Sequence, residues 1–121
     1  MSRELNIGTR KHTTVSAVDE RGQGNANHSY EIFPSNQRKD EVIWCQAITF
    51  QNGPIKEVGV NGVTNEDLIV IIIDRLRGFQ SGKYTCRYNA LALTKLEEAL
   101  MWLRNRTNER ENRGVEGTNT K

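Results

Sequence analysis

Three arginines near the end of the chain have the spacing of one helix face. Arg106, Arg110 and Arg113 stand at positions i, i+4 and i+7, so a helix brings them to the same side. A guanidinium group offers paired N–H donors that match the oxygens of a phosphate group. Because clustered like charges repel one another, this stripe predicts an anion or an acidic partner between the arginines. An alternative is that Glu109 and Glu111 neutralise the stripe within the helix itself.

Two other residues, Phe79 and Asn89, are candidates for recognition of a nucleobase. Phe79 stands at a predicted bend between two helices, where its ring can stack on a base. Asn89 stands among apolar residues, and its amide can donate and accept at once, as the edge of a purine requires. Plain packing at the bend explains Phe79 equally well, and a satisfied surface amide is the alternative for Asn89.

The charge distribution favours a small anion over a long nucleic acid. The formal net charge is +2, which implies no general attraction to a polyanion. Residues 75–96 contain five cations and no acid, whereas residues 1–62 contain seven basic and seven acidic residues. A solvated helix surface accounts for the same pattern, so the binding site for a small anion is one of two interpretations.

Motifs for catalysis and for metal binding are missing from the sequence. It contains no His-Asp doublet, no CxxC and no GxxxxGK[ST] motif. Glu97 and Glu98 are adjacent and therefore point apart on a helix, which excludes a catalytic pair of carboxylates. His12 and His28 have no cysteine or aspartate at metal-ligand spacing. We therefore predict a binding protein rather than an enzyme, without a metal or a cofactor.

One long helix of about 27 residues, predicted within residues 83–113, which contain no proline or glycine, must position most of these side chains. Leucines recur at helical intervals, at Leu93, Leu96, Leu100 and Leu103. A helix of about 27 residues would be about 40 Å long, which is too long for a domain of this size to bury alone. We expect it to pair with another helix or to cross a subunit boundary. Residues 113–118 end the helix and can fold back as a lid.

A second helix is predicted over residues 63–77. Its segment LIVIII is β-branched enough for a strand, but Thr64 and Asp67 have the spacing of a capping box. Gly78 supplies a stop, and residues 80–82 form a tight connector to the long helix. We expect this mostly apolar helix to be covered by the sheet, by the long helix and by a second subunit.

The first 62 residues predict a small antiparallel sheet. Apolar residues occur on both faces of residues 41–51, which we interpret as a central strand. Asn52-Gly53 is typical of a hairpin turn, and residues 54–60 are expected to be the return strand. The fold class is therefore α+β, in one domain of residues 1–121. Its strands are expected over residues 1–62, and its helical hairpin and tail over 63–118.

Two further features bear on the compartment. We predict that Cys45 and Cys86 are buried thiols of a reducing compartment rather than a disulfide. Residues 1–21 lack the apolar segment of a signal peptide. The longest apolar run, residues 68–73, is far shorter than a membrane span, so no membrane partner is expected.

Several motifs of the second half of the chain resemble those of a known family. The segment NALALTKLEEALMWL stands at residues 89–103, RT at 106–107 and RGVEGT at 113–118. With these motifs, residues 62–118 resemble the phage Thoeris anti-defence proteins, the first-described sponge family, whose C-terminal hairpin is shared with anti-CBASS sponges. The strand-rich N-terminal half matches the family but is less diagnostic.

The resemblance implies a phage protein of the host cytoplasm that captures a signalling molecule. Such proteins bind cyclic ADP-ribose isomers, here glycocyclic ADP-ribose, which TIR-domain enzymes make. They do not cleave this ligand, and the Thoeris effector is never activated. The resemblance also implies a homo-oligomer, a dimer or a hexamer. Some members hold CBASS cyclic di- or trinucleotides at a second site.

The same resemblance implies roles for individual residues. By motif position, Phe79 stacks on adenine and Asn89 hydrogen-bonds the ligand. The diphosphate is held by the three arginines Arg106, Arg110 and Arg113. The second site is not fixed by any motif, and our candidates for it are Arg38, Lys39 and Lys56.

Two alternative functions stay open at this point. A helical-hairpin protein that binds nucleic acid would show salt-sensitive binding to long DNA or RNA. A weak nucleotide hydrolase would fail to return its ligand intact after denaturation.

Overall fold

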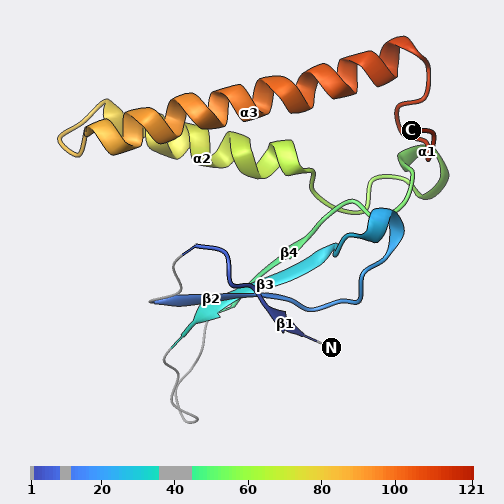
Figure 1. Ribbon diagram of the computed structural model, residues 1–121, viewed down its shortest axis with the longest axis horizontal. Coiled ribbons are helices and arrows are strands. Elements are labelled where there is room, and N and C mark those ends of the chain that lie inside the picture. The colour runs from blue at the N-terminus through green and yellow to red at the C-terminus, as the bar shows by residue number, and fades with distance from the viewer. Residues whose placement is uncertain (1, 9–11, 36–44) are drawn as a thin grey trace. The chain divides into compact units, whose positions relative to one another are not determined.

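The computed structural model describes residues 2–8, 12–35 and 45–121. These residues form two compact units. One unit comprises Met1–Gly53 with Val60–Gly62, and the other comprises Pro54–Gly59 with Val63–Lys121. We refer to them as the sheet unit and the hairpin unit (Figure 1).

The sheet unit is an antiparallel meander of four strands. The strands are β1 (Arg3–Glu4), β2 (Thr13–Ala17), β3 (Ser29–Pro34) and β4 (Gln46–Thr49). They lie in the order β1-β2-β3-β4, and every neighbouring pair is antiparallel. A short 3₁₀ turn, η1 (Gln23–Asn25), lies between β2 and β3. The predicted N-terminal antiparallel sheet is confirmed.

The buried positions of the sheet unit are small and mostly polar. Ala17 is fully buried, and Thr14 and Ser16 on the same strand are also buried. The Thr14 hydroxyl lies 3.0 Å from that of Ser35. Polar groups can be buried when they are hydrogen-bonded. Hydrogen bonds therefore stabilise the interior of this unit together with apolar contacts.

The loop between β2 and β3 is held by a carboxylate, Asp19. Asp19 accepts hydrogen bonds from the His28 backbone N–H at 2.9 Å and from the Asn27 amide at 3.0 Å. The backbone hydrogen bond from His28 lowers the pKa of Asp19, because it stabilises the charged form. Arg3 donates to the buried Asn27 at 2.6 Å, which ties the first strand to the same loop.

The interpretation of residues 41–51 as a central strand is wrong. Within the described residues, β4 pairs with β3 alone and is therefore an edge strand. Residues 41–44 lie outside the described part of the chain, and the ordered strand covers only Gln46–Thr49. Apolar residues on both faces did not indicate burial between two strands.

The expected return strand is also wrong, because residues 54–60 contain a short helix, α1 (Ile55–Val58). The side chain of Asn61 explains why no hairpin ladder forms after Asn52-Gly53. The Asn52 backbone N–H donates to the Asn61 side chain at 2.8 Å, and the Asn61 amide returns a bond of 2.7 Å to the Asn52 carbonyl. These side-chain bonds take the place of a backbone ladder.

Gly62 closes this loop at a point where no side chain fits. A Cβ atom at Gly62 would lie 2.4 Å from the carbonyl carbon of Phe50 and 2.6 Å from the Thr49 carbonyl oxygen. The residue therefore allows the chain to pass directly over the end of β4.

The first helix of the hairpin, α2 (Asn65–Gln80), begins at the predicted capping box. The Asp67 N–H donates to the Thr64 hydroxyl at 3.2 Å, and the Thr64 N–H donates to the Asp67 carboxylate at 2.9 Å. The predicted stop at Gly78 is wrong, because the helix continues to Gln80. Glycine costs a helix about 1 kcal/mol but does not end it. The Ser81 hydroxyl donates a hydrogen bond of 2.7 Å to the Gly78 carbonyl.

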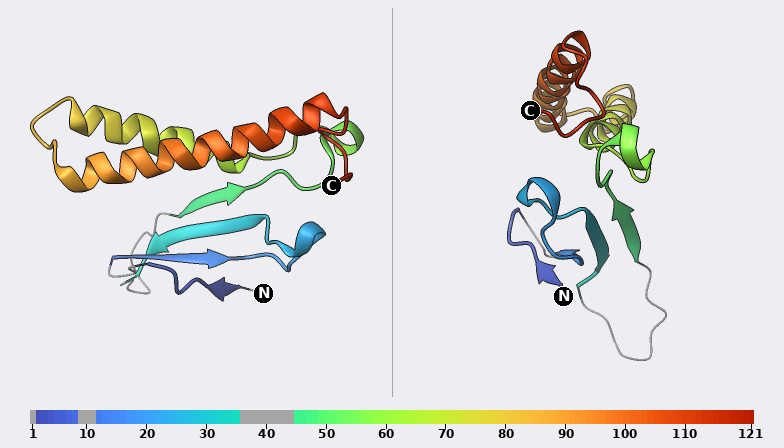
Figure 2. Two further views of the ribbon diagram at one scale, coloured as in Figure 1. Left: turned by 45° about the horizontal axis from the view of Figure 1, so that its top comes forward. Right: turned by 90° about the vertical axis from the view of Figure 1, so that its right-hand side faces the viewer.

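The second helix, α3 (Arg87–Asn112), has 26 residues and is about 39 Å long. This length agrees with the prediction of about 27 residues, and the first helical residue is Arg87. Gln80 sets this start, because its side chain donates to the Cys86 carbonyl at 3.1 Å and accepts from the Cys86 N–H at 3.0 Å. α2 and α3 lie side by side as a two-helix hairpin (Figure 2). The structure therefore confirms the α+β fold class.

The hairpin helices leave much apolar surface uncovered within one chain. Ile73 is the only buried apolar residue of α2 and α3, with 5% exposed. Other large apolar side chains of these helices are exposed, among them Val70, Ile71, Ile72, Leu91, Met101 and Trp102. Within the hairpin unit, α3 therefore leaves much of the apolar surface of α2 uncovered.

Both cysteines are free and exposed, so their predicted burial is wrong. Within the described residues, no helix combines the length and the apolar character needed to cross a membrane.

Candidate functional site

Phe79 lies in the last turn of α2, inside a cluster of aromatic and cationic side chains. The guanidinium carbon of Arg75 lies 4.9 Å from the centroid of the Phe79 ring. The Tyr84 ring meets Phe79 edge-on, at 6.2 Å between centroids and an interplanar angle of 86°. Lys83 places its ammonium 5.4 Å from the Tyr84 centroid. Rings and cations together can stack on a base and attract an anion.

Arg75 and Tyr84 were not among our sequence candidates. One signal was available for Arg75, because it precedes Phe79 by four residues and therefore lies on the same helix face. Tyr84 belongs to the connector, whose path depends on the Gln80 clamp at Cys86. No local spacing in the sequence predicts that contact.

Asn89 lies in the first turn of α3, next to the same connector. Its backbone N–H donates to the Cys86 sulfur at 3.4 Å. Its side-chain amide is half-buried and has no hydrogen-bond partner among the residues that the structure describes. The donor and the acceptor of this amide are therefore available to a ligand or to solvent, and both interpretations of Asn89 stay open.

The predicted arginines lie at the opposite end of α3. Asn89 and Arg106 are separated by about 25 Å, since 17 residues rise 1.5 Å each. One chain therefore does not bring the bend residues and the arginines to one small ligand. Arg106 itself is exposed, and in the described part of the chain it makes no hydrogen bond or ion pair.

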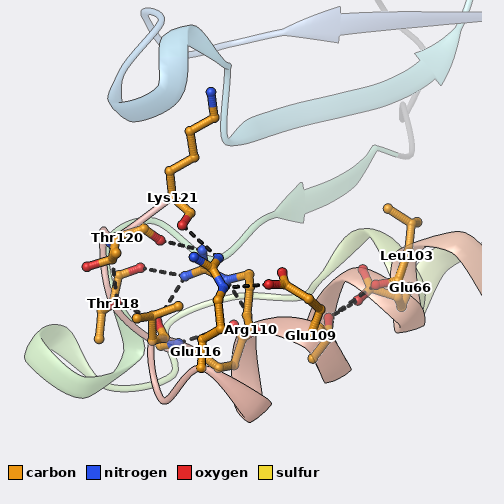
Figure 3. Close-up of polar contacts among 12 residues, drawn as sticks. Glu66, Leu103, Glu109, Arg110, Glu116, Thr118, Thr120 and Lys121 are labelled. Carbon is orange, nitrogen blue, oxygen red and sulfur yellow. Dashed lines mark hydrogen bonds and ion pairs between the residues drawn. The ribbon is translucent and has the colours of Figure 1, made fainter.

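Arg110 is buried in contacts with the chain that follows it. It is 5% exposed. Its guanidinium donates to the carbonyls of Val115 at 3.0 Å and Thr118 at 3.1 Å, and to that of Thr120 (Figure 3). Its Nε lies 3.5 Å from the Glu116 carboxylate. The tail folds back onto the helix as expected, and whether it acts as a lid over a ligand is still a prediction.

Arg113 has acidic and backbone partners too. It pairs with Glu109 at 2.5 Å and donates to the Lys121 carbonyl at 2.7 Å. The alternative in which Glu109 neutralises part of the arginine stripe is therefore realised for Arg113. Of the three arginines, Arg106 is the one with a free guanidinium.

A separate groove of about 440 Å³ runs between α2 and α3. Its lining combines apolar and charged side chains. Arg77 of α2 and Glu97 of α3 form an ion pair of 2.8 Å across it. None of the five predicted ligand residues lines this groove. Its lining comprises Val70, Ile73, Asp74, Arg77, Glu97, Leu100, Met101 and Arg104. Across the described ranges, no group of three side chains is placed to hold a metal ion.

Residues of the proposed second site are only partly described. Arg38 and Lys39 lie outside the described residues. Lys56 lies in α1 and is exposed, and its backbone N–H donates to the Gly117 carbonyl at 3.0 Å.

Comparisons with known proteins identify the hairpin. Thoeris anti-defense 1 of Bacillus phage SBSphiJ7 is 62% identical over 83 residues, which are 69% of this chain. The chain spans 58% of the length of that relative. The model of the Acb2/Tad1 hairpin domain matches residues 46–107, which include β4, α1, α2 and most of α3. The resemblance to phage Thoeris anti-defence sponges is thereby confirmed, and the chain belongs to the Acb2/Tad1 hairpin domain family.

Proposed function

We propose that this protein counters Thoeris defence by binding a cyclic ADP-ribose isomer, glycocyclic ADP-ribose, and withholding it from its effector. The name of the phage relative, Thoeris anti-defense 1, supports the defence system. The observation that carries the ligand class is the bend of the hairpin. There, a ring flanked by cations and an unpaired amide offer stacking, charge and purine-edge hydrogen bonds together.

In this proposal Phe79 stacks on the adenine. Arg75, one turn earlier in α2, holds the Phe79 ring in place. Asn89 donates to and accepts from the ligand. Arg106 binds the diphosphate as a fork, because two parallel N–H bonds match two phosphate oxygens. The connector supplies further positive charge from Lys83.

The site is shared between two copies of the chain. The bend and Arg106 are about 25 Å apart along α3, so the bend of one copy meets Arg106 of another. The exposed apolar residues of both helices support such an assembly, a dimer or a hexamer, because surfaces of this kind are typical of contact sites. Symmetric association is also the commonest form of oligomer.

The proposed role is capture without catalysis. The proposed ligand contacts, Phe79, Asn89 and Arg106, include no nucleophile and no general acid or base suited to phosphate or glycosidic cleavage. Tight binding alone keeps the effector inactive, because the effector responds only to free ligand.

Recovery of the ligand tests this function. The protein is incubated with glycocyclic ADP-ribose, filtered to remove free ligand, and heated, and the released material is analysed by chromatography. We expect intact ligand in an amount close to that of the binding sites. Release of ADP-ribose or a smaller product would contradict capture without cleavage. A filtrate that keeps all the ligand would contradict binding. Unchanged capture in a large excess of DNA separates the proposal from a nucleic-acid-binding protein.

A further inference from the structure

Arg110 was predicted to bind phosphate, but its donors are already in use. Its two terminal nitrogens donate to three backbone carbonyls, of Val115, Thr118 and Thr120. Its Nε lies 3.5 Å from Oε2 of Glu116, and among the described residues neither of these two atoms has another partner. A guanidinium group has five N–H donors and no acceptor. Little of this capacity is left for a ligand, and the group is 5% exposed.

The carbonyls belong to a segment that reaches back to a distant helix. We call residues 114–120 the clasp. The Gly117 carbonyl accepts from the Lys56 N–H of α1 at 3.0 Å. This N–H lies in the first turn of a helix, where it has no partner within the helix, so the clasp satisfies it.

Gly117 is required at this contact for two reasons. Its φ is +81°, a conformation that residues with a side chain rarely adopt. A Cβ atom there would also lie 3.2 Å from Lys56 Cγ and 3.7 Å from Ile55 Cβ. The contact between the clasp and α1 is therefore close and specific in shape.

We propose that Arg110 is a positioning residue that holds the clasp, and through it α1, against the end of α3. A phosphate could reach Arg110 only if three carbonyl bonds and the Glu116 ion pair were given up. The family model ends at residue 107, so the clasp extends the hairpin beyond the matched domain. This inference does not depend on the proposed ligand.

Hydrogen exchange on the full, ligand-free protein tests the clasp. The reporter is the Lys56 amide, which is remote from Arg110 in sequence and is protected by Gly117. We expect Arg110→Ala and Gly117→Ala each to speed exchange at Lys56 at least tenfold. Gly117→Ala leaves the arginine intact, so agreement between the two variants assigns the effect to the clasp.

Two controls make the result specific. Arg113→Ala removes an exposed arginine nearby and should leave exchange at Lys56 unchanged. Amides in the middle of α3, such as that of Leu100, should exchange as in the wild type in every variant, which shows that the hairpin is folded. Wild-type protection of Lys56 in Arg110→Ala would overturn the proposal.

A binding measurement then asks whether Arg110 touches the ligand. With glycocyclic ADP-ribose as the probe, a positioning role predicts the same loss of affinity in Arg110→Ala and Gly117→Ala, and no further loss in the double variant. A direct contact predicts a loss of tenfold or more in Arg110→Ala alone, which would overturn the proposal. If the wild type does not bind the probe, the proposed function fails, and the exchange measurement still decides the role of Arg110.

Discussion

The two compact units of the chain satisfy their side chains in opposite ways. In the sheet unit, the buried residues are small or polar, and hydrogen bonds such as those to Asp19 and Asn27 are completed inside the unit. In the hairpin unit, α2 and α3 bury one apolar residue, Ile73, and leave large apolar side chains exposed. The amide of Asn89 and the guanidinium of Arg106 also lack partners within the described residues.

This difference supports the proposal that the hairpin unit binds the ligand and a second copy. Groups that are satisfied within their own unit have little to gain from a ligand or a second copy. Uncovered apolar faces and unpaired polar groups gain from both. We therefore propose that the assembly surface and the ligand site belong to the hairpin unit. The sheet unit contributes only its own fold. Four predictions test this assignment, from the largest expected effect to the smallest.

The strongest effect is expected from the double variant Phe79→Ala with Asn89→Ala. Loss of stacking costs about 1–3 kcal/mol per base, and loss of a buried polar contact costs about 1–3 kcal/mol more. Calorimetry should show glycocyclic ADP-ribose bound about thirtyfold more weakly or worse, since about 2 kcal/mol is the smallest combined loss. Phe50→Ala, which removes an aromatic contact of the sheet unit with Tyr30, is the control and should bind normally. Equal losses in both would end the assignment to the hairpin.

The two neighbouring isoleucines Ile73 and Ile71 separate folding from assembly. Ile73 is buried, so Ile73→Ala should cost about 2–5 kcal/mol of the free energy of unfolding. Ile71 is 62% exposed, so Ile71→Ala should change that free energy by about 0.5 kcal/mol or less while weakening self-association. Urea unfolding of dilute protein and light scattering over a range of concentrations measure the two effects. The assembly account would be wrong if Ile71→Ala unfolded dilute protein as readily as Ile73→Ala.

Arg106→Lys keeps the charge of the proposed diphosphate contact but removes the fork. A charge-assisted hydrogen bond is worth about 1.5–3 kcal/mol, so loss of one should weaken binding about tenfold or more. Arg104→Lys, on the same helix but in the groove lining, is the matched control and should bind as the wild type does. Calorimetry at two salt concentrations distinguishes paired hydrogen bonds to the phosphate from a general electrostatic attraction, because salt screens the latter. Near wild-type affinity for Arg106→Lys would contradict the proposed pair of hydrogen bonds from Arg106 to the diphosphate.

The smallest effect concerns the sheet unit and pH. The pKa of Asp19 is lower in the folded protein than its unfolded value of about 3.9. Its contribution to stability is therefore fully present above the unfolded pKa and is lost as the pH falls through the folded pKa. Thermal unfolding between about pH 5 and pH 3 should show a smaller decline in Asp19→Asn than in the wild type. Ligand affinity at pH 7 should not change, and a change would connect the sheet unit to binding.

The predictable parts of the fold are those set by local chemistry. Thr64 and Asp67 indicated the start of α2 because both members of a capping box lie within one turn. The leucine spacing likewise predicted α3. α1 was not predicted, because it depends on hydrogen bonds between Asn52 and Asn61, which are nine residues apart. These bonds replace the hairpin turn that the Asn52-Gly53 dipeptide favours.

The candidate site was predictable by type but not by partner. Asn89 and Arg106 lie in the expected long helix, and their side chains have no partner among the described residues. Phe79 lies in the last turn of α2, beyond the predicted end of that helix, and contacts Arg75 and Tyr84. Arg110 has the same spacing as Arg106, but its carbonyl partners come from a tail with no periodic pattern. The burial of the cysteines was wrongly predicted, because Cys45 directly precedes the edge strand β4 and Cys86 is the N-cap of α3, and both are exposed there.

The central claim, a site built from the bend of one copy and Arg106 of another, can be tested most directly by mixing two inactive variants. Asn89→Ala has an intact Arg106, and Arg106→Ala has an intact bend. If the site is shared, dissociating and reassembling an equal mixture restores sites that combine the two intact halves. For random pairing in a symmetric dimer, we predict recovery of about a quarter of the wild-type binding capacity in a filtration assay with glycocyclic ADP-ribose. No recovery from a mixture that has demonstrably exchanged subunits would contradict the account.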